Sequence, residues 1–117
     1  MKRMIRATSN FIKASNSIPQ LWKEYYAEDA VKDGTIEEDE VEDVLAIKVE
    51  PEFTEEDYDL FIAGITQYCR PGDIESVSYA MDEGEAAGFD GGYEVKFKDG
   101  SSQLYGWYFG KDDLTEI

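Results

Sequence analysis

The sequence predicts an α+β domain in which two or three helices pack on an antiparallel sheet of about three or more strands. Three observations predict this class: a length of 117 residues, a capped amphipathic helix over 54–69, and an Asp99-Gly100 turn between two alternating segments. A chain of this length forms one hydrophobic core, so residues 1–117 are expected to be a single domain. With 42% apolar and 14% aromatic residues, the chain can fill that core.

A first helix is expected over 18–29. Ser17 and Gln20 have the spacing of a capping box, and apolar residues recur at helical spacing behind them. Asp33, Gly34 and Thr35 should break this helix, because glycine and aspartate favour turns.

A short acidic helix and a strand are expected next. Thr35 and Glu38 have the spacing of a second capping box, which predicts a helix with Val41, Val44 and Leu45 on one side. Apolar and other residues then alternate over 45–49, which predicts a strand ended by Pro51.

The clearest element is the helix over 54–69. Thr54 is its expected N-cap, and three acids in the first turn face the positive end of the helix dipole. Pro71 and Gly72 stop the helix. Its apolar stripe consists of Tyr58, Phe61, Ile62, Ile65, Tyr68 and Cys69.

The remaining residues predict a sheet. Alternation indicates strands over 74–81, 93–98 and 102–109, and the glycine-rich stretch 82–92 is expected to be a loop. A two-residue Asp99-Gly100 turn would pair Lys98 with Ser101, Val95 with Leu104 and Glu94 with Tyr105. This register directs Tyr93, Val95, Phe97, Leu104 and Tyr108 to the core, and Tyr105, Trp107 and Phe109 to the other face.

Net charge is the anomaly of the composition. The 27 Asp and Glu outnumber the 11 Lys and Arg, for a formal net charge of −16. Residues 1–23 contain five cations and no acid, whereas 24–59 contain sixteen acids and two lysines. This balance argues against direct binding of nucleic acid or of an anionic membrane, because both attract positive charge.

The residue types also argue against an enzyme, and we expect no cofactor. The chain has no histidine, and its single cysteine, Cys69, lies on the apolar stripe of a helix. The acids within the 82–92 stretch would repel a phosphate. Because no signal peptide and no membrane-spanning stretch is evident, the cytoplasm is the expected compartment.

The acids of 24–59 form the first candidate site. Apolar residues interrupt them, so the segment is expected to fold with its carboxylates outward. Carboxylates one helical turn apart are about 6 Å from each other, comparable with successive phosphates along a strand. They could occupy the basic groove of a nucleic-acid-binding protein, or they could serve solubility alone. The expected contact residues are Asp33, Glu37, Glu38, Asp39, Glu40, Glu42, Asp43, Glu55 and Glu56.

In size, acidity and lack of histidine, the chain resembles the small nucleic-acid-mimicking inhibitors of phages and mobile elements, the anti-restriction and anti-CRISPR proteins. The resemblance covers composition and assigns no particular residue. It implies a partner such as a Cas effector, a restriction enzyme or another basic DNA-binding protein, and the host cytoplasm as the place of action.

Calcium binding is a second hypothesis. Asp29, Asp33, Glu37 and Glu40 fall on the ligand positions of an EF-hand loop over 29–40. Val31 stands where an oxygen ligand belongs, so the ligand set is incomplete. The other interpretation of this segment is a turn between two helices.

The third hypothesis is a plain protein–protein interaction module. Tyr105, Trp107 and Phe109 on an outer sheet face would form an apolar patch of the kind found at interfaces. Alternatively, the helix that begins within residues 1–23 would cover this patch.

Overall fold

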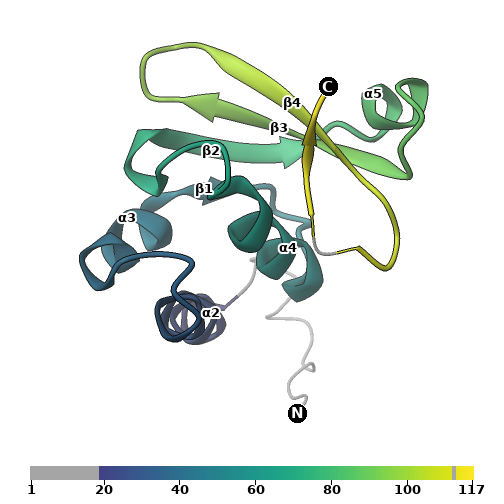
Figure 1. Cartoon of the computed structure of the whole chain (residues 1–117). Helices are drawn as coiled ribbons and strands as arrows, with labels where there is room; N and C mark the ends of the chain where they lie inside the picture. The colour runs from purple at the N-terminus through teal and green to yellow at the C-terminus, as the bar shows by residue number, and fades with distance from the viewer. Residues whose placement is uncertain (1–18, 112) are drawn as a thin grey trace.

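The structure is a computed structural model, and it describes residues 19–111 and 113–117. Within these residues, five strands form one mixed sheet in the order β1-β2-β3-β4-β5. Figure 1 shows α2, α3 and α4 on one side of this sheet. The expected α+β class is therefore confirmed. The elements are α2 (Gln20–Lys32), the 3₁₀ turn η1 (Glu38–Glu40), α3 (Val41–Ala46), β1 (Lys48–Val49), α4 (Glu55–Ile65), the 3₁₀ turn η2 (Pro71–Asp73), β2 (Ile74–Tyr79), α5 (Met81–Ala86), β3 (Gly91–Phe97), β4 (Ser102–Trp107) and β5 (Thr115–Glu116).

Helix α2 ends in a Schellman motif. The Gly34 N–H donates to the Val31 carbonyl at 3.0 Å, the Thr35 N–H donates to the Ala30 carbonyl at 2.9 Å, and Gly34 has a φ of 80°. The helix therefore continues three residues beyond the expected end at residue 29, and the expected glycine break is confirmed. The capping box proposed at Ser17 lies outside the described residues.

The short acidic helix is confirmed, but its start was wrongly predicted. The turn begins after Glu37, whose N–H donates to Glu40 Oε1 at 2.8 Å, so Thr35 is not its cap. The strand expected over 45–49 is also shorter, because α3 continues through Ala46. What remains of it, β1, pairs parallel with β2, whereas the sequence predicted antiparallel strands.

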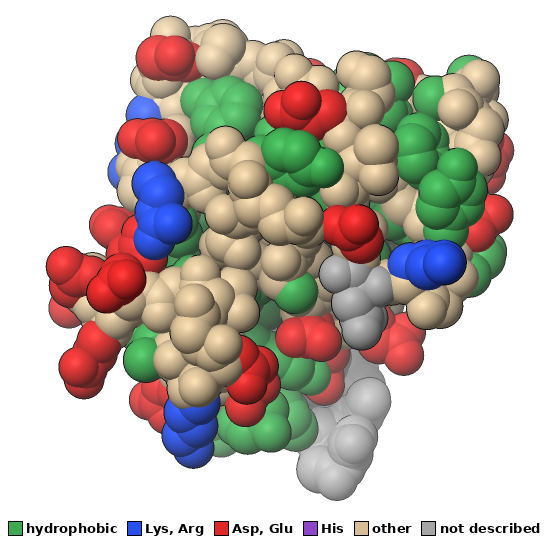
Figure 2. Space-filling model, viewed as in Figure 1, with side chains coloured by type: hydrophobic (Ala, Val, Ile, Leu, Met, Phe, Trp, Pro, Cys, Tyr) green, Lys and Arg blue, Asp and Glu red, His purple; other side chains and the backbone are tan. Residues whose placement is uncertain are grey.

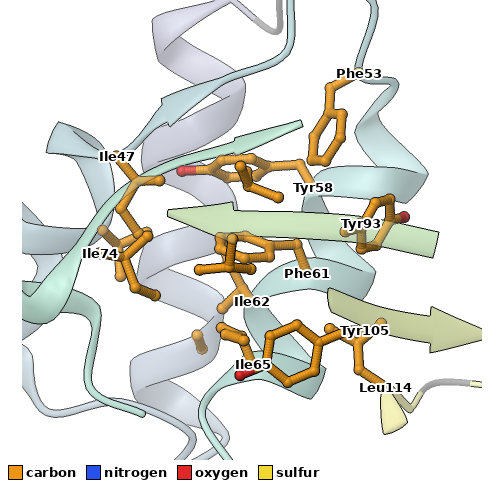
Figure 3. Packing of buried hydrophobic residues seen from close by; sticks show 14 of the residues in the cluster. Ile47, Phe53, Tyr58, Phe61, Ile62, Ile65, Ile74, Tyr93, Tyr105 and Leu114 are labelled. Atoms are coloured by element: carbon orange, nitrogen blue, oxygen red, sulfur yellow. The ribbon is translucent and has the colours of Figure 1, made fainter. Parts of the chain in front are cut away.

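Helix α4 confirms the predicted cap. Thr54 Oγ1 accepts from the Asp57 N–H at 3.1 Å, and Asp57 Oδ2 accepts from the Thr54 N–H at 3.1 Å. The helix ends at Ile65, earlier than expected, and Cys69 lies beyond it, half-buried. Figure 3 shows the buried α4 side chains gathered with Tyr93 and Tyr105 of the sheet. These α4 residues are Tyr58, Phe61, Ile62 and Ile65.

The β3–β4 hairpin differs from the predicted register by one residue. Tyr93 pairs with Tyr105. The Phe97 N–H donates to the Ser101 carbonyl, and the Phe97 carbonyl accepts from the Gly100 N–H, so that the loop has three residues and ends at Gly100. The φ of Gly100 is +95°, as a type I turn followed by a bulge requires. The Asp-Gly pair fits this loop as well as the shorter one, and sequence alone did not separate them.

This shift exchanges the faces of β4, because strand side chains alternate. Tyr105 and Trp107 are 1% and 8% exposed on the core face, so the prediction of an outer patch around them was wrong. Tyr108, expected in the core, is 45% exposed, and Leu104 is half-buried. The described part of α2 packs on α3 and α4 and so does not cover such a patch.

The stretch 82–92 is not a loop throughout, because it begins with α5. A Cβ on Gly84 would lie 2.2 Å from the Gly91 carbonyl oxygen, and a Cβ on Gly92 would lie 2.8 Å from the Ala80 oxygen. The glycines therefore allow the helix backbone to touch β3 directly.

Among the described helices, none is long and apolar enough to cross a lipid bilayer.

We expect Gly84→Ala to lower the free energy of unfolding by about 1–3 kcal/mol, the usual cost of overpacking. In an unpacked helix the same change would raise stability by about 1 kcal/mol, so the sign of the effect tests the contact. Urea unfolding measures it, with the exposed neighbour Glu85→Ala as the control. A more stable Gly84→Ala variant would contradict the packing of α5 on β3.

Candidate functional site

Six predicted contact residues lie together along the chain around η1 and α3. We call this set the acidic face, and all six side chains are exposed. Figure 2 shows acidic side chains gathered at the left edge of the molecule, where Figure 1 places this segment. The acidic face consists of Asp33, Glu37, Glu38, Asp39, Glu42 and Asp43.

Buried apolar residues hold the acidic face in place. Ile36, Val44 and Ile47 are 2–4% exposed and belong to the single core cluster of the described residues. The apolar residues that interrupt the acids are thus the anchors of η1 and α3. The expectation that the acidic segment 24–59 folds is confirmed, and the carboxylates of the acidic face are exposed. Asp57 of the same segment is an exception, because its carboxylate binds Tyr79 and Tyr93.

Glu40, the seventh predicted residue of this segment, is engaged by Arg70. Glu40 Oε2 accepts from Arg70 Nε at 2.8 Å, and Oε1 accepts from Arg70 Nη2 in a bidentate pair. The hydrogen bonds from Arg70 lower the pKa of the Glu40 carboxyl, and the Glu37 N–H adds to this effect. Arg70 thereby joins the segment before η2 to the start of α3.

Glu55 and Glu56, the other two predicted residues, lie on α4. Glu55 Oε1 accepts from the Tyr26 hydroxyl of α2 at 3.3 Å, and Glu56 lines a cleft beside the sheet. Glu55 therefore links two helices.

The geometry gives no support to the calcium hypothesis. Asp29 lies in the last turn of α2 and Asp33 caps it, so residues 29–33 continue a helix. Glu40 is occupied by Arg70. No group of three or more acids, cysteines or histidines is arranged to hold a metal ion within the described part of the chain. The EF-hand spacing coincides here with a Schellman helix end.

Cys69 is not activated as a nucleophile. Burial, with the nearby charges of Asp73 and Glu116, raises the pKa of its thiol to about 11. The thiolate is the reactive form, so the thiol stays protonated at neutral pH. This agrees with the interpretation of Cys69 as a packing residue.

A second candidate site, which the sequence did not indicate, is a cleft of about 810 Å³ between α4 and the sheet. Its walls combine acids from the start of α4 with aromatic rings from β2, β3, β4 and the loop after β4. These residues are far apart in the chain, so no local sequence motif predicts the cleft. The cleft is lined by Glu52, Thr54, Glu56, Asp57, Asp59, Leu60, Tyr79, Met81, Tyr93, Trp107, Tyr108, Phe109, Gly110 and Lys111.

The carboxylate of Asp57 organises the floor of this cleft. Asp57 Oδ1 accepts from the Tyr93 hydroxyl at 2.7 Å, and Oδ2 accepts from the hydroxyls of Tyr79 and Thr54. One carboxylate thus caps α4 and binds two tyrosines of neighbouring strands. Burial raises the pKa of both phenols, and the hydrogen bonds to Asp57 raise it further.

We expect Asp57→Ala to lower the free energy of unfolding by about 2–4 kcal/mol. Loss of the capping-box hydrogen bond that Asp57 accepts from the Thr54 N–H costs about 1 kcal/mol, and leaving the buried Tyr93 hydroxyl unpaired costs about 1–3 kcal/mol more. Chemical denaturation measures the loss, with Glu56→Ala in the same helical turn as the control. Adding Tyr93→Phe to Asp57→Ala should restore part of the loss; equal effects of Asp57→Ala and Glu56→Ala would contradict this network.

We expect stability to fall as the pH rises above about 10, the ordinary pKa of a phenol. In the folded protein the pKa of Tyr79 and Tyr93 is raised, so the unfolded chain loses these protons first. The contribution of the two phenols is therefore fully present below about pH 10 and is lost as the pH rises toward the folded values. Urea unfolding at alkaline pH measures this loss, and Tyr79→Phe/Tyr93→Phe should flatten the profile. The difference in tyrosinate absorbance between the native chain and this double variant isolates the two phenols, and a difference that develops near pH 10 in the folded protein would refute the prediction.

The chain matches no protein-family model, no curated protein and no solved structure.

Proposed function

We propose that this protein is a non-enzymatic inhibitor that occupies the basic groove of a nucleic-acid-binding protein, such as a Cas effector or a restriction enzyme. The observation that supports this most is the acidic face, which presents six exposed carboxylates on a short packed segment. A nucleic-acid groove is lined with cations placed for a series of phosphates, and the acidic face offers a comparable series of negative charges.

The acidic face keeps its charge available. The ion pairs of Lys48 with Glu75 and of Arg70 with Glu40 do not include any of its six carboxylates. The hydrogen bonds to Glu40 are the main cause that raises the pKa of the Arg70 guanidinium, and the charges of Glu37 and Asp39 raise it further. Arg70 therefore offsets part of the negative charge at these two residues of the acidic face.

The packing of η1 and α3 favours binding as well as exposure. The carboxylates are borne by a backbone anchored in the core, so little backbone entropy is lost when a partner binds. The net charge of −16 would also steer a basic partner over a long range, which makes association fast and dependent on salt.

Charge reversal on the acidic face tests the proposal. Glu38, Asp39 and Glu42 are exposed, so changing all three to Lys should leave the fold intact. The test is a gel-shift assay with a panel of Cas effectors and restriction enzymes. The native chain should prevent a protein of the panel from binding DNA, and the triple variant should leave its DNA binding unchanged. Each exposed ion pair contributes only about 0–1 kcal/mol, so single reversals should have small effects.

The matched control reverses Asp82, Glu83 and Glu85 to Lys, the same change of charge on α5. This variant should still inhibit, and added salt should weaken inhibition. If the control loses inhibition and the Glu38/Asp39/Glu42 variant keeps it, the site is elsewhere. If no protein of the panel is inhibited, or inhibition does not depend on salt, mimicry of nucleic acid is wrong.

A further inference from the structure

We propose that the cleft between α4 and the sheet binds an arginine side chain of a partner protein. This inference goes beyond the proposed function, because the cleft shares no residue with the acidic face. The cleft combines two features that guanidinium groups recognise, an aromatic wall and carboxylates at its rim.

The aromatic wall is a row of four rings that crosses three strands and ends outside the sheet. The ring centroids of Tyr79 and Tyr93 are 6.2 Å apart, those of Tyr93 and Trp107 are 6.0 Å apart, and those of Trp107 and Phe109 are 5.2 Å apart. Phe109 is 75% exposed. An exposed ring at the end of a buried row leaves a stacking surface that solvent covers in the free protein.

The turn over 108–111, which presents Phe109, is held by hydrogen bonds. The Phe109 N–H donates to Asp90 Oδ2 at 2.7 Å, and the Lys111 N–H donates to the Tyr108 carbonyl across a turn in which Gly110 has a φ of 80°. The exposed ring is thus held at the mouth of the cleft by its own backbone. A ligand does not have to order this turn on binding.

The charge of the lining favours a cation. Four acids line the cleft, Glu52, Glu56, Asp57 and Asp59, against one cation, Lys111. Asp57 is bound to the two tyrosines, whereas Glu52 and Glu56 have exposed side chains. A guanidinium fits this set better than an ammonium, because it stacks on a ring with its face while its edge donates to a carboxylate.

Trp107 adds an unsatisfied polar group to this wall. Its indole N–H is buried and has no hydrogen-bond acceptor in the described structure. A guanidinium has only donors, so this N–H would not bond to the arginine side chain itself. The same N–H is a local reporter, because the other tryptophan, Trp22, lies on α2 and does not line the cleft.

Nuclear magnetic resonance on the isotope-labelled full chain tests the proposal. The probe is the peptide acetyl-Gly-Arg-Gly-amide, and its uncharged analogue carries citrulline in place of arginine. The arginine peptide should shift the indole N–H resonance of Trp107, assigned with Trp22→Phe, in a saturable way, and the citrulline peptide should not. Equal shifts with both peptides, or no saturable shift with arginine, would overturn the proposal.

Two pairs of variants locate the binding. Glu52→Gln with Glu56→Gln should weaken binding of the arginine peptide about tenfold, as expected when charge-assisted contacts are lost. Asp82→Asn with Glu85→Gln removes the same charge outside the cleft and should leave the affinity unchanged. Phe109→Ala should weaken binding while the protein stays folded, because that ring is 75% exposed. Equal losses in the two pairs would mean that the arginine senses net charge and not the cleft.

The same titration on the Glu38/Asp39/Glu42→Lys variant separates this inference from the proposed function. Binding of the arginine peptide should persist when the acidic face is reversed, because Glu38, Asp39 and Glu42 do not line the cleft. Loss of binding in that variant would place the arginine on the acidic face and overturn the assignment to the cleft.

Discussion

The carboxylate of Asp57 joins the elements on which the rest of the molecule depends. It closes the capping box of α4 and accepts hydrogen bonds from Tyr79 on β2 and Tyr93 on β3. The start of the helix is therefore fixed against the middle of the sheet. From that point the α4 stripe follows at helical spacing and meets the core face of the strands, where Tyr93, Val95 and Tyr105 are at most 1% exposed.

Sequence reasoning succeeded where structure is decided locally. The cap at Thr54 and the break at Gly34 depend on neighbouring residues, and both are confirmed. The hairpin register depends on a choice between two loops that both suit Asp99 and Gly100, and an error of one residue exchanged the faces of Tyr105 and Trp107. Helix α5 was missed because local propensity treats a glycine as a sign of a loop. In the structure, Gly84 of α5 instead allows close contact with β3.

The two candidate sites divide in the same way. The acidic face lies within the short stretch 33–43, and five of its six residues fall between Glu37 and Asp43, so its residues could be named before the structure was known. The bidentate pair of Glu40 with Arg70 spans thirty positions and could not. The cleft draws on α4, the ends of three strands and the loop after β4, so only the folded chain brings it together.

Both borders of the sheet are formed by very short strands. β1 and β5 contain two residues each, and each border carries a charged, exposed side chain, Lys48 on one and Glu116 on the other. A strand this short offers few free N–H and C=O groups to a passing chain, and the charges disfavour stacking of copies. The longest strand, β3, is paired on both sides, and β1 and β5 each cover two residues of the outer edges of β2 and β4. The fold therefore resists growth of the sheet from one molecule to the next, a route by which exposed strands begin amyloid-like assembly.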